Sequence, residues 1–152
     1  MLSCIWKGVD DSRMEIAHVE LMSGALQATG TQIGASYELR YELGEGVLRA
    51  TVVGGPSLEL DLGDHDFFDL GFSPLFNSLP VRRDRLHVGG DARDYAMAWV
   101  DVPSLQVHRS EQRYEPLRPG VVRFRSGSFA ADIEFDDDGL VTLYPGLAER
   151  VG

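Results

Sequence analysis

The segment from Phe72 to Arg83, FSPLFNSLPVRR, places two arginines directly after a short run rich in apolar residues. Arginine presents a planar fork of N–H donors that matches a carboxylate or a phosphate. Pro74 and Pro80 restrict the backbone at and before their own positions, so the residues between them, 75–78, are expected to form at most one helical turn. The segment therefore predicts a loop of fixed shape that offers apolar surface and cationic donors side by side.

The alternative is a structural loop whose arginines pair with acidic neighbours, for which Asp69 and Asp84 are the nearest candidates. The distribution of charge favours a binding role. Residues 80–125 hold nine of the 14 basic side chains but six of the 24 acidic ones, in a chain of net charge −10. A concentration of arginine in an acidic chain indicates a surface that faces an anion, such as an anionic small molecule.

The chain has the length of one domain, and residues 1–152 are expected to form a single one. The net charge of −10 and a pI near 4.7 argue against binding to nucleic acids or to anionic bilayers, which rely on basic surfaces. No apolar stretch near the start is long enough for a signal peptide or a membrane span. The lone cysteine, Cys4, suits a reducing compartment, so we expect a cytoplasmic protein in which Cys4 is a small buried residue.

The alternation that is typical of β-strands dominates the sequence. It is clearest in residues 37–43, YELRYEL, whose apolar members are predicted to share one buried face. Turn signals containing glycine separate such runs, among them Ser23-Gly24 and Asp138-Gly139. Further strands are predicted at 2–6, 13–22, 25–32, 48–53, 58–62, 85–88, 95–102, 105–114, 121–125, 129–135 and 140–144.

The connections between these runs are too short for crossover helices, so the sheet is predicted to be antiparallel, with about ten to twelve strands. A sheet of this size without covering helices must curl to bury its apolar face. The expected fold is therefore all-β, a single strongly curved antiparallel sheet in the form of a half-barrel or β-roll. Residues 75–78 and 145–151 are expected to form short helical turns.

Four short motifs follow one another in the second half of the chain. They are SPLFNSLPVRR from Ser73, VDVPSLQV from Val100, QRYEPL from Gln112 and GLVTLYPGL from Gly139. In order and spacing they resemble the bacterial family of putative glycolipid-binding proteins. The resemblance implies a curled, nearly all-β fold similar to the half-barrels of periplasmic lipoprotein carriers, and a glycolipid-like ligand.

The resemblance also implies which residues contact the ligand, at positions that match the family pattern. They are Asn77, Arg82, Arg83, Gln112, Tyr114 and Tyr144. A structural role is the alternative for each of them. Asn77 can close a turn through its amide, and Tyr144 can anchor the last strand. Arg82 and Arg83 would point to opposite faces of a strand, so that one of them at most would face a given pocket.

No pattern typical of a catalytic site or a metal site is present, so the sequence predicts neither catalytic residues nor a cofactor. The four histidines are dispersed, and no nucleophile elbow, Walker loop or dinucleotide fingerprint occurs. The segment Asp64-His65-Asp66 could hold a metal if another carboxylate folded back onto it. Asp136-Asp137-Asp138-Gly139 starts like a calcium loop but lacks the later glutamate, and it predicts a hairpin turn.

Three kinds of function remain open. The first is a noncatalytic binding protein that holds an amphiphile in the concave face of the sheet, with the head group near Arg82 or Arg83. The second is an enzyme that acts on a small molecule with a tyrosine, an arginine and a carboxylate in the same cavity. The third is a structural module that forms a homodimer through an open sheet edge or through the concave face.

Overall fold

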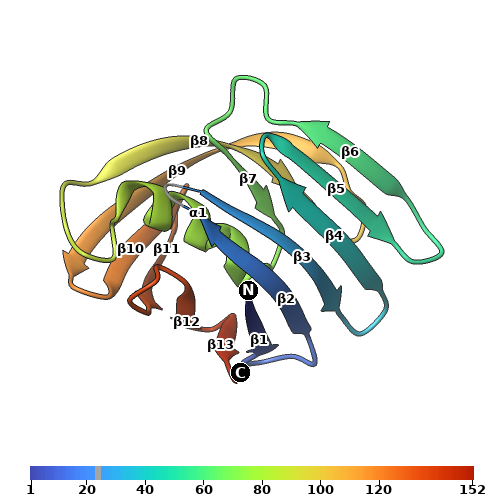
Figure 1. Cartoon of the computed structure of the whole chain (residues 1–152), viewed down its shortest axis with the longest axis horizontal. Helices are drawn as coiled ribbons and strands as arrows, with labels where there is room; N and C mark the ends of the chain where they lie inside the picture. The colour runs from blue at the N-terminus through green and yellow to red at the C-terminus, as the bar shows by residue number, and fades with distance from the viewer. Residues whose placement is uncertain (23–24) are drawn as a thin grey trace.

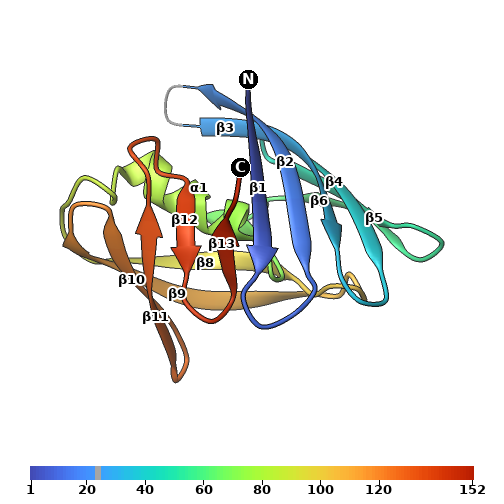
Figure 2. The same ribbon diagram turned by 90° about the horizontal axis from the view of Figure 1, so that it is seen from below.

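A computed structural model describes residues 1–22 and 25–152 of the chain. All its strands belong to one sheet, in the order β6-β5-β4-β3-β2-β1-β13-β12-β11-β10-β9-β8-β7. The sheet is strongly curved and unclosed, and Figure 1 shows the helix α1 (Pro74–Asp84) on its concave side. Figure 2 shows the terminal strands side by side. The strands are β1 (Leu2–Gly8), β2 (Met14–Met22), β3 (Ala25–Ile33), β4 (Glu38–Gly44), β5 (Val47–Val52), β6 (Ser57–Asp61), β7 (Phe67–Leu70), β8 (Arg93–Val100), β9 (Val107–Arg118), β10 (Val121–Ser126), β11 (Phe129–Phe135), β12 (Val141–Tyr144) and β13 (Ala148–Arg150).

The predicted fold class, one strongly curved sheet with little helix, is confirmed, and the 13 strands slightly exceed the predicted number. The alternation in β4 has the predicted effect. Leu39, Tyr41 and Leu43 are 0, 4 and 5% exposed, whereas Arg40 and Glu42 between them face solvent. The turn signal at Ser23-Gly24 lies outside the described residues.

Three short segments differ from the prediction. Residues 85–88, expected as a strand, form the turn after α1, and residues 145–151, expected as a helical turn, contain strand β13. Strand β7 was not predicted, although it carries part of the site described below. Each of these segments is too short for a clear period, and its structure depends on partners that are distant in the sequence.

The strands β7 and β8 run parallel, which corrects the expectation of a wholly antiparallel sheet. Helix α1 and the loop that follows it supply the crossover between them. The other strand pairs within residues 1–22 and 25–152 are antiparallel. The parallel register sets Asp69 of β7 opposite Trp99 of β8, and it thereby brings a carboxyl group next to an indole ring.

Helix α1 corrects the expectation of a single helical turn between the two prolines. It has 11 residues and passes through Pro80. Pro74 lies in the first turn, where a missing N–H costs nothing, but Pro80 deprives the helix of one backbone hydrogen bond. Seven helix residues, Phe76 and Val81 among them, are buried. This burial offsets the lost bond, and because it involves distant strands the local sequence could not predict it.

The core beneath the sheet consists of two apolar clusters, and α1 contributes to both. Phe76 packs with Trp6 and Leu39 in one cluster, while Val81 packs with Met97 and Ile133 in the other. Cys4 is fully buried in the first cluster, as predicted. Among the described residues, no helix has the length and apolar character needed to cross a membrane.

Candidate functional site

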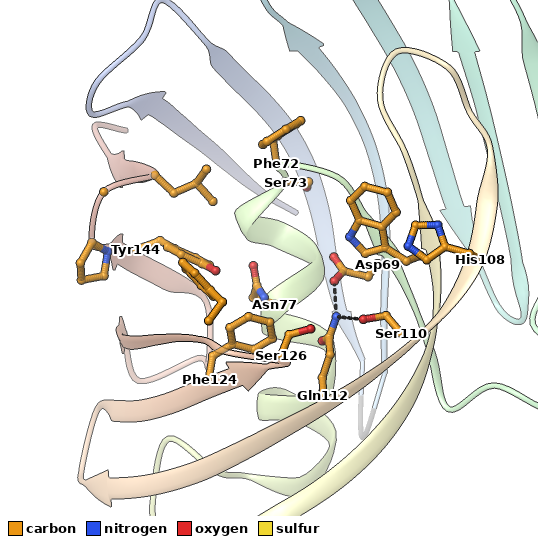
Figure 3. Close-up of a pocket in the computed structure, with 15 residues that line it drawn as sticks. Asp69, Phe72, Ser73, Asn77, His108, Ser110, Gln112, Phe124, Ser126 and Tyr144 are labelled. Atoms are coloured by element: carbon orange, nitrogen blue, oxygen red, sulfur yellow. Dashed lines mark hydrogen bonds between the residues drawn. The ribbon is translucent and has the colours of Figure 1, made fainter.

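A cleft of about 580 Å³ lies between α1 and the strands around it. Its side chains come from β7, α1, β8, β9, β10, β11 and β12 and from the turns beside them (Figure 3). The cleft therefore forms only when the sheet has curled around the helix. The lining residues are Asp69, Phe72, Ser73, Asn77, Trp99, His108, Ser110, Gln112, Phe124, Ser126, Phe129, Tyr144, Pro145, Gly146 and Leu147.

A chain of hydrogen bonds forms the polar floor of the cleft. The Asn77 amide nitrogen donates to the Tyr114 hydroxyl at 3.2 Å, and this hydroxyl lies 3.4 Å from Gln112 Oε1, to which it donates. Gln112 Nε2 in turn donates to Asp69 Oδ2 at 2.7 Å and to Ser110 Oγ at 3.3 Å. Each member restricts the rotation of the next, so the two amides and the carboxyl group present fixed polar atoms to the cleft.

Asp69 is a carboxyl group of the cleft whose pKa is shifted by its surroundings. The residue is 8% exposed, and burial raises the pKa of its carboxyl group to about 6, although the hydrogen bond from Gln112 acts in the opposite direction. Within the described part of the chain, no lysine or arginine lines the cleft. The cleft therefore holds a carboxylate without a cation to neutralise it.

Aromatic rings form two sides of the cleft. On one side, Trp99 of β8 and His108 of β9 face each other with ring centroids 4.6 Å apart. On the other side, Phe129 lies 6.1 Å from Phe124 and 6.5 Å from Tyr144, measured between centroids. Phe129 is 51% exposed and stands at the rim. The arrangement offers flat apolar faces on both sides of the polar floor, as Figure 3 shows.

The structure brings together four of the six residues that the sequence predicted to contact a ligand. Asn77, Gln112 and Tyr144 line the cleft. Tyr114 is 1% exposed and lies behind them, where its hydroxyl joins Asn77 to Gln112. Gln112 and Tyr114 share one face of β9, as the alternation of a strand requires. Tyr114 can therefore position the two amides without contacting a ligand in the cleft.

Arg82 and Arg83 lie at a second cavity, of about 310 Å³, which Leu79 also lines. Arg82 and Arg83 follow Leu79 by three and four positions, which places both arginines on the same face of the helix as Leu79. Asn77 precedes Leu79 by two positions, which turns it to the opposite side of α1. The helix thus separates the arginines from the polar cleft. The sequence analysis missed this separation because the helical turn that it predicted, residues 75–78, ended before the arginines.

The guanidinium group of Arg82 is occupied by backbone carbonyl groups. It donates to Met22 O at 3.0 Å and Ala25 O at 3.3 Å, which flank the connection between β2 and β3, and to Asp138 O at 3.0 Å in the β11–β12 turn. Asp136–Gly139 forms this turn, as predicted. Arg82 therefore ties α1 to two distant hairpins.

Arg83 makes the kind of ion pair that the alternative interpretation predicted. It donates from Nε and Nη2 to the Asp84 carboxylate, at 3.3 and 3.0 Å, and its guanidinium group lies over the Phe67 ring at 4.4 Å. The predicted pairing of an arginine with Asp69 is not found in the described residues, where Gln112 occupies that carboxyl group instead.

The sequence from residue 51 to 150 matches the model of a family described as putative glycolipid-binding, which covers every residue of the cleft. The chain belongs to this family. No curated protein matches the sequence. Among solved structures, a DUF1089 family protein from Pseudomonas aeruginosa is similar, with a TM-score of 0.68 and 21% identity, over 90% of this chain and 92% of that one. At this identity the likeness shows a shared fold.

A second buried polar network joins Ser73 to three residues that precede the segment matched by the family model, Glu15, Gln32 and Tyr41. Glu15 of β2 is 2% exposed, and its carboxyl group accepts hydrogen bonds from Ser73 at 2.7 Å, Tyr41 at 2.9 Å and Gln32 at 3.3 Å. Burial raises the pKa of Glu15 to about 7 against the opposing effect of these bonds. Because Ser73 also lines the cleft, this network supports the start of α1 from the other half of the sheet.

Several residues of the cleft were missed by the sequence analysis. Trp99, Ser110, Phe124 and Phe129 lie on separate strands, and no motif marks them. The alternation along each strand could have predicted that these side chains point toward the concave side of the sheet. Which of them lie close together depends on strand register, which the sequence does not show.

The described side chains do not gather into a metal-binding site. No cluster of three or more His, Cys, Asp or Glu side chains suited to a metal ion occurs in the residues that the structure describes.

Proposed function

We propose that this protein is a noncatalytic binding protein for an amphiphile and that the cleft receives the sugar head of the ligand. The observation that carries the proposal is the union of a fixed polar floor, Asn77-Gln112-Asp69, with aromatic sides in one cleft. Planar amide and carboxyl groups form paired hydrogen bonds with neighbouring hydroxyls of a sugar. Aromatic faces pack against the C–H groups of the sugar ring. The description of the family supports the same class of ligand.

The apolar part of the ligand has a path out of the cleft. A shallow groove of about 560 Å³ shares Phe129 and Pro145 with the cleft and continues over Ala130 and Ala131. Three charged side chains, Arg123, Arg125 and Asp132, also line this groove. An alkyl chain lying on this path would cover Phe129, which is half exposed. Removal of such surface from water stabilises a complex by about 25 cal/mol per Å². We propose that the chain of the amphiphile leaves the cleft here.

The charge of the cleft limits which classes of head group it can bind. The lining residues that the structure describes include Asp69 and no lysine or arginine. An anionic head would enter a site that already holds an unneutralised carboxylate, and two like charges in a partly buried site repel strongly. We therefore propose a head group that is not anionic. Arg82 and Arg83, which the sequence suggested for an anionic head, are proposed to stabilise the fold.

The number of carboxyl groups that line the cleft favours ligand binding over glycoside hydrolysis as the function. Most glycosidases place two carboxyl groups on either side of the scissile bond, about 5–10 Å apart. Asp69 is the carboxyl group that lines this cleft within residues 1–22 and 25–152, and Glu15 is buried beyond Ser73. Arg82 and Arg83, which the enzyme alternative from the sequence analysis would use, lie at the other cavity. These placements support a protein that holds its ligand unchanged.

Octyl β-glucoside, used below its micelle-forming concentration, is expected to bind and to change the fluorescence of Trp99, since that indole lines the cleft. Methyl β-glucoside, which lacks the chain, is expected to bind more weakly. Replacement Phe129→Ser is expected to weaken binding of the octyl compound about tenfold, because an apolar contact worth about 1.5 kcal/mol is lost. Fluorescence titration measures all three effects.

A matched control for this titration is Val53→Ser. Val53 is 50% exposed, close to the 51% of Phe129, but it lies in the turn after β5 and lines no part of the cleft. Trp99→Phe identifies the source of the signal against Trp6. Absence of any response to octyl β-glucoside, or an equal loss in both serine variants, would contradict the proposal. Release of glucose from the probe would favour the enzyme instead.

Two broader expectations from the sequence remain proposals. We propose a cytoplasmic location on the grounds of the acidic composition and the lone cysteine. We also propose that two copies pair through a free sheet edge, since β6 and β7 end the sheet without a second partner among the described strands. Light scattering after size-exclusion chromatography tests the second proposal, and a monomeric mass at high concentration would refute it.

A further inference from the structure

Asp69 differs from Glu15, the other carboxyl group that is buried among the described residues, and from the half-buried Asp84 in how its charge is compensated. Glu15 accepts three side-chain hydrogen bonds, and Asp84 pairs with Arg83 and accepts the Tyr95 hydroxyl at 2.6 Å. Among the described residues Asp69 accepts one side-chain bond, from Gln112, and that bond reaches only Oδ2. Asp69 nevertheless lines the cleft at 8% exposure. The other oxygen, Oδ1, is thus left for a group that enters from the cleft.

A carboxylate in this position favours a cation over a neutral donor. Its single amide donor leaves most of the desolvation cost of the charge uncompensated, and a charge-assisted hydrogen bond from an ammonium group is roughly twice as strong as a neutral one. The surroundings add to this preference. Trp99, Phe124 and Tyr144 line the same cleft, and the negative quadrupole of an aromatic ring attracts a cation within about 6 Å of its face.

The other ionisable groups of the cleft, His108 and Tyr144, do not compensate the charge of Asp69. His108 is packed against Trp99, with centroids 4.6 Å apart, and is not a hydrogen-bond partner of Asp69 in the described structure. Tyr144 can donate only a neutral hydroxyl hydrogen, since burial raises its pKa far above neutrality. Among the described residues that line the cleft, none therefore pairs with Asp69 as a cation.

We propose that the sugar head bound in this cleft carries an ammonium group, which pairs with Asp69; the ligand class is an amphiphilic amino sugar. This inference rests on the proposed function, because it assumes that the cleft receives the sugar. It adds the charge of the ligand and the residue that selects it. Gln112 and Asn77 then bind the hydroxyl groups beside the ammonium group, and the aromatic sides enclose it.

Four probes with the same ring and the same octyl chain test the proposal by fluorescence titration near neutral pH. They are octyl β-glucoside, its 2-amino-2-deoxy and 6-amino-6-deoxy analogues, and octyl glucuronide. The better of the two amino compounds is expected to bind at least about tenfold more tightly than the neutral glucoside, as a charge-assisted hydrogen bond in a dry site allows. The glucuronide is expected to bind more weakly than the neutral compound. Two amino isomers are used because the cleft fixes one place for the cation but not the ring carbon that bears it.

The variant Asp69→Asn keeps the shape of the side chain and removes its charge. The ratio of amino to neutral affinity is expected to fall to about one in this variant, whatever happens to the absolute affinities. Asp61→Asn, on the exposed face of edge strand β6, is the control and is expected to keep the wild-type ratio. If Asp69→Asn fails to fold, the ranking of the four probes on the wild-type protein still decides the matter.

The outcomes separate the two proposals. Binding of the neutral glucoside with no gain for either amino compound would overturn the ammonium inference and leave the sugar-binding function in place. Tightest binding of the glucuronide would overturn it as well. Failure of all four probes to bind would refute the proposed function and the inference with it. An amino preference that persists in Asp69→Asn would show that another group selects the cation, and would overturn the assignment to Asp69.

Discussion

The free energy of unfolding is expected to fall by about 3 kcal/mol on account of Glu15 alone as the pH rises from about 4.5 to about 7. Burial raises the pKa of this carboxyl group from 4.5 to about 7 in the folded protein. The folded state therefore binds a proton that the unfolded state has already released in this pH range. Stability is at its full value below the unfolded pKa and is lost as the pH rises through the folded one. Urea unfolding at a series of pH values measures the effect.

The variant Glu15→Gln is expected to remove this part of the pH dependence, because an amide does not titrate. The residue Glu20, exposed on the same strand β2, provides the control Glu20→Gln, which should leave the slope unchanged. Asp69 adds a second contribution of the same sign, since burial raises its pKa from 3.8 to about 6, so the slope of Glu15→Gln should be reduced rather than abolished. An unaltered slope in Glu15→Gln would contradict the assignment.

Replacement Arg82→Ala is expected to destabilise the protein by about 3 kcal/mol, which lowers the melting temperature by about 6–12 °C. The side chain donates to three carbonyl oxygens, of Met22, Ala25 and Asp138, and a partly exposed position weakens each of these charge-assisted bonds. Their loss frees helix α1 from two hairpins at once. Calorimetry or thermal denaturation followed by circular dichroism measures the change.

The neighbouring residue supplies the matched control for Arg82. Arg83→Ala removes an exposed ion pair with Asp84 and a contact with Phe67, and it is expected to cost about 1 kcal/mol or less. Arg82→Lys keeps the charge but cannot reach three carbonyls with one ammonium group, so an intermediate loss is expected. A stable Arg82→Ala protein that no longer binds octyl β-glucoside would instead assign Arg82 to the ligand site.

The sequence predicted the sheet well because strand periodicity is a local property. In β4 the polarity of each residue indicates which face of the sheet its side chain lies on, and Leu39, Tyr41 and Leu43 are buried as predicted. Helix α1 was mispredicted because the local effect of Pro80 is unfavourable, while the burial that outweighs it comes from strands far away in the chain. The β13 strand depends in the same way on its neighbours β1 and β12.

The cleft was predictable only in part. Gln112 and Tyr114 share a face by strand alternation, and the family motif pointed to Asn77 and Tyr144. Their meeting with Asp69 depends on the parallel register of β7 and β8, which sequence patterns do not specify. Arg82 illustrates another limit. Its partners are backbone carbonyls, which every residue possesses, so no residue type in the sequence marks them.

The strands lie in the sheet in the same order as in the sequence, if the first strand is taken to follow the last. Every pair of neighbouring strands is consecutive in sequence, except β1 and β13, which join the two ends of the chain in the middle of the arch. The protein is thus two meanders, β1–β6 and β8–β13, the second extended by the parallel strand β7. They meet at one seam, where Trp6 lies opposite Arg150 and the backbones of Ile5 and Val151 are hydrogen-bonded. Local hairpins can form within each meander before the seam closes, because short loops cost little entropy. A circular permutant that links the ends across this seam and opens the chain between β6 and β7 would make every pair of neighbouring strands consecutive in sequence, with the α1 crossover between β7 and β8 retained and no strand pair lost.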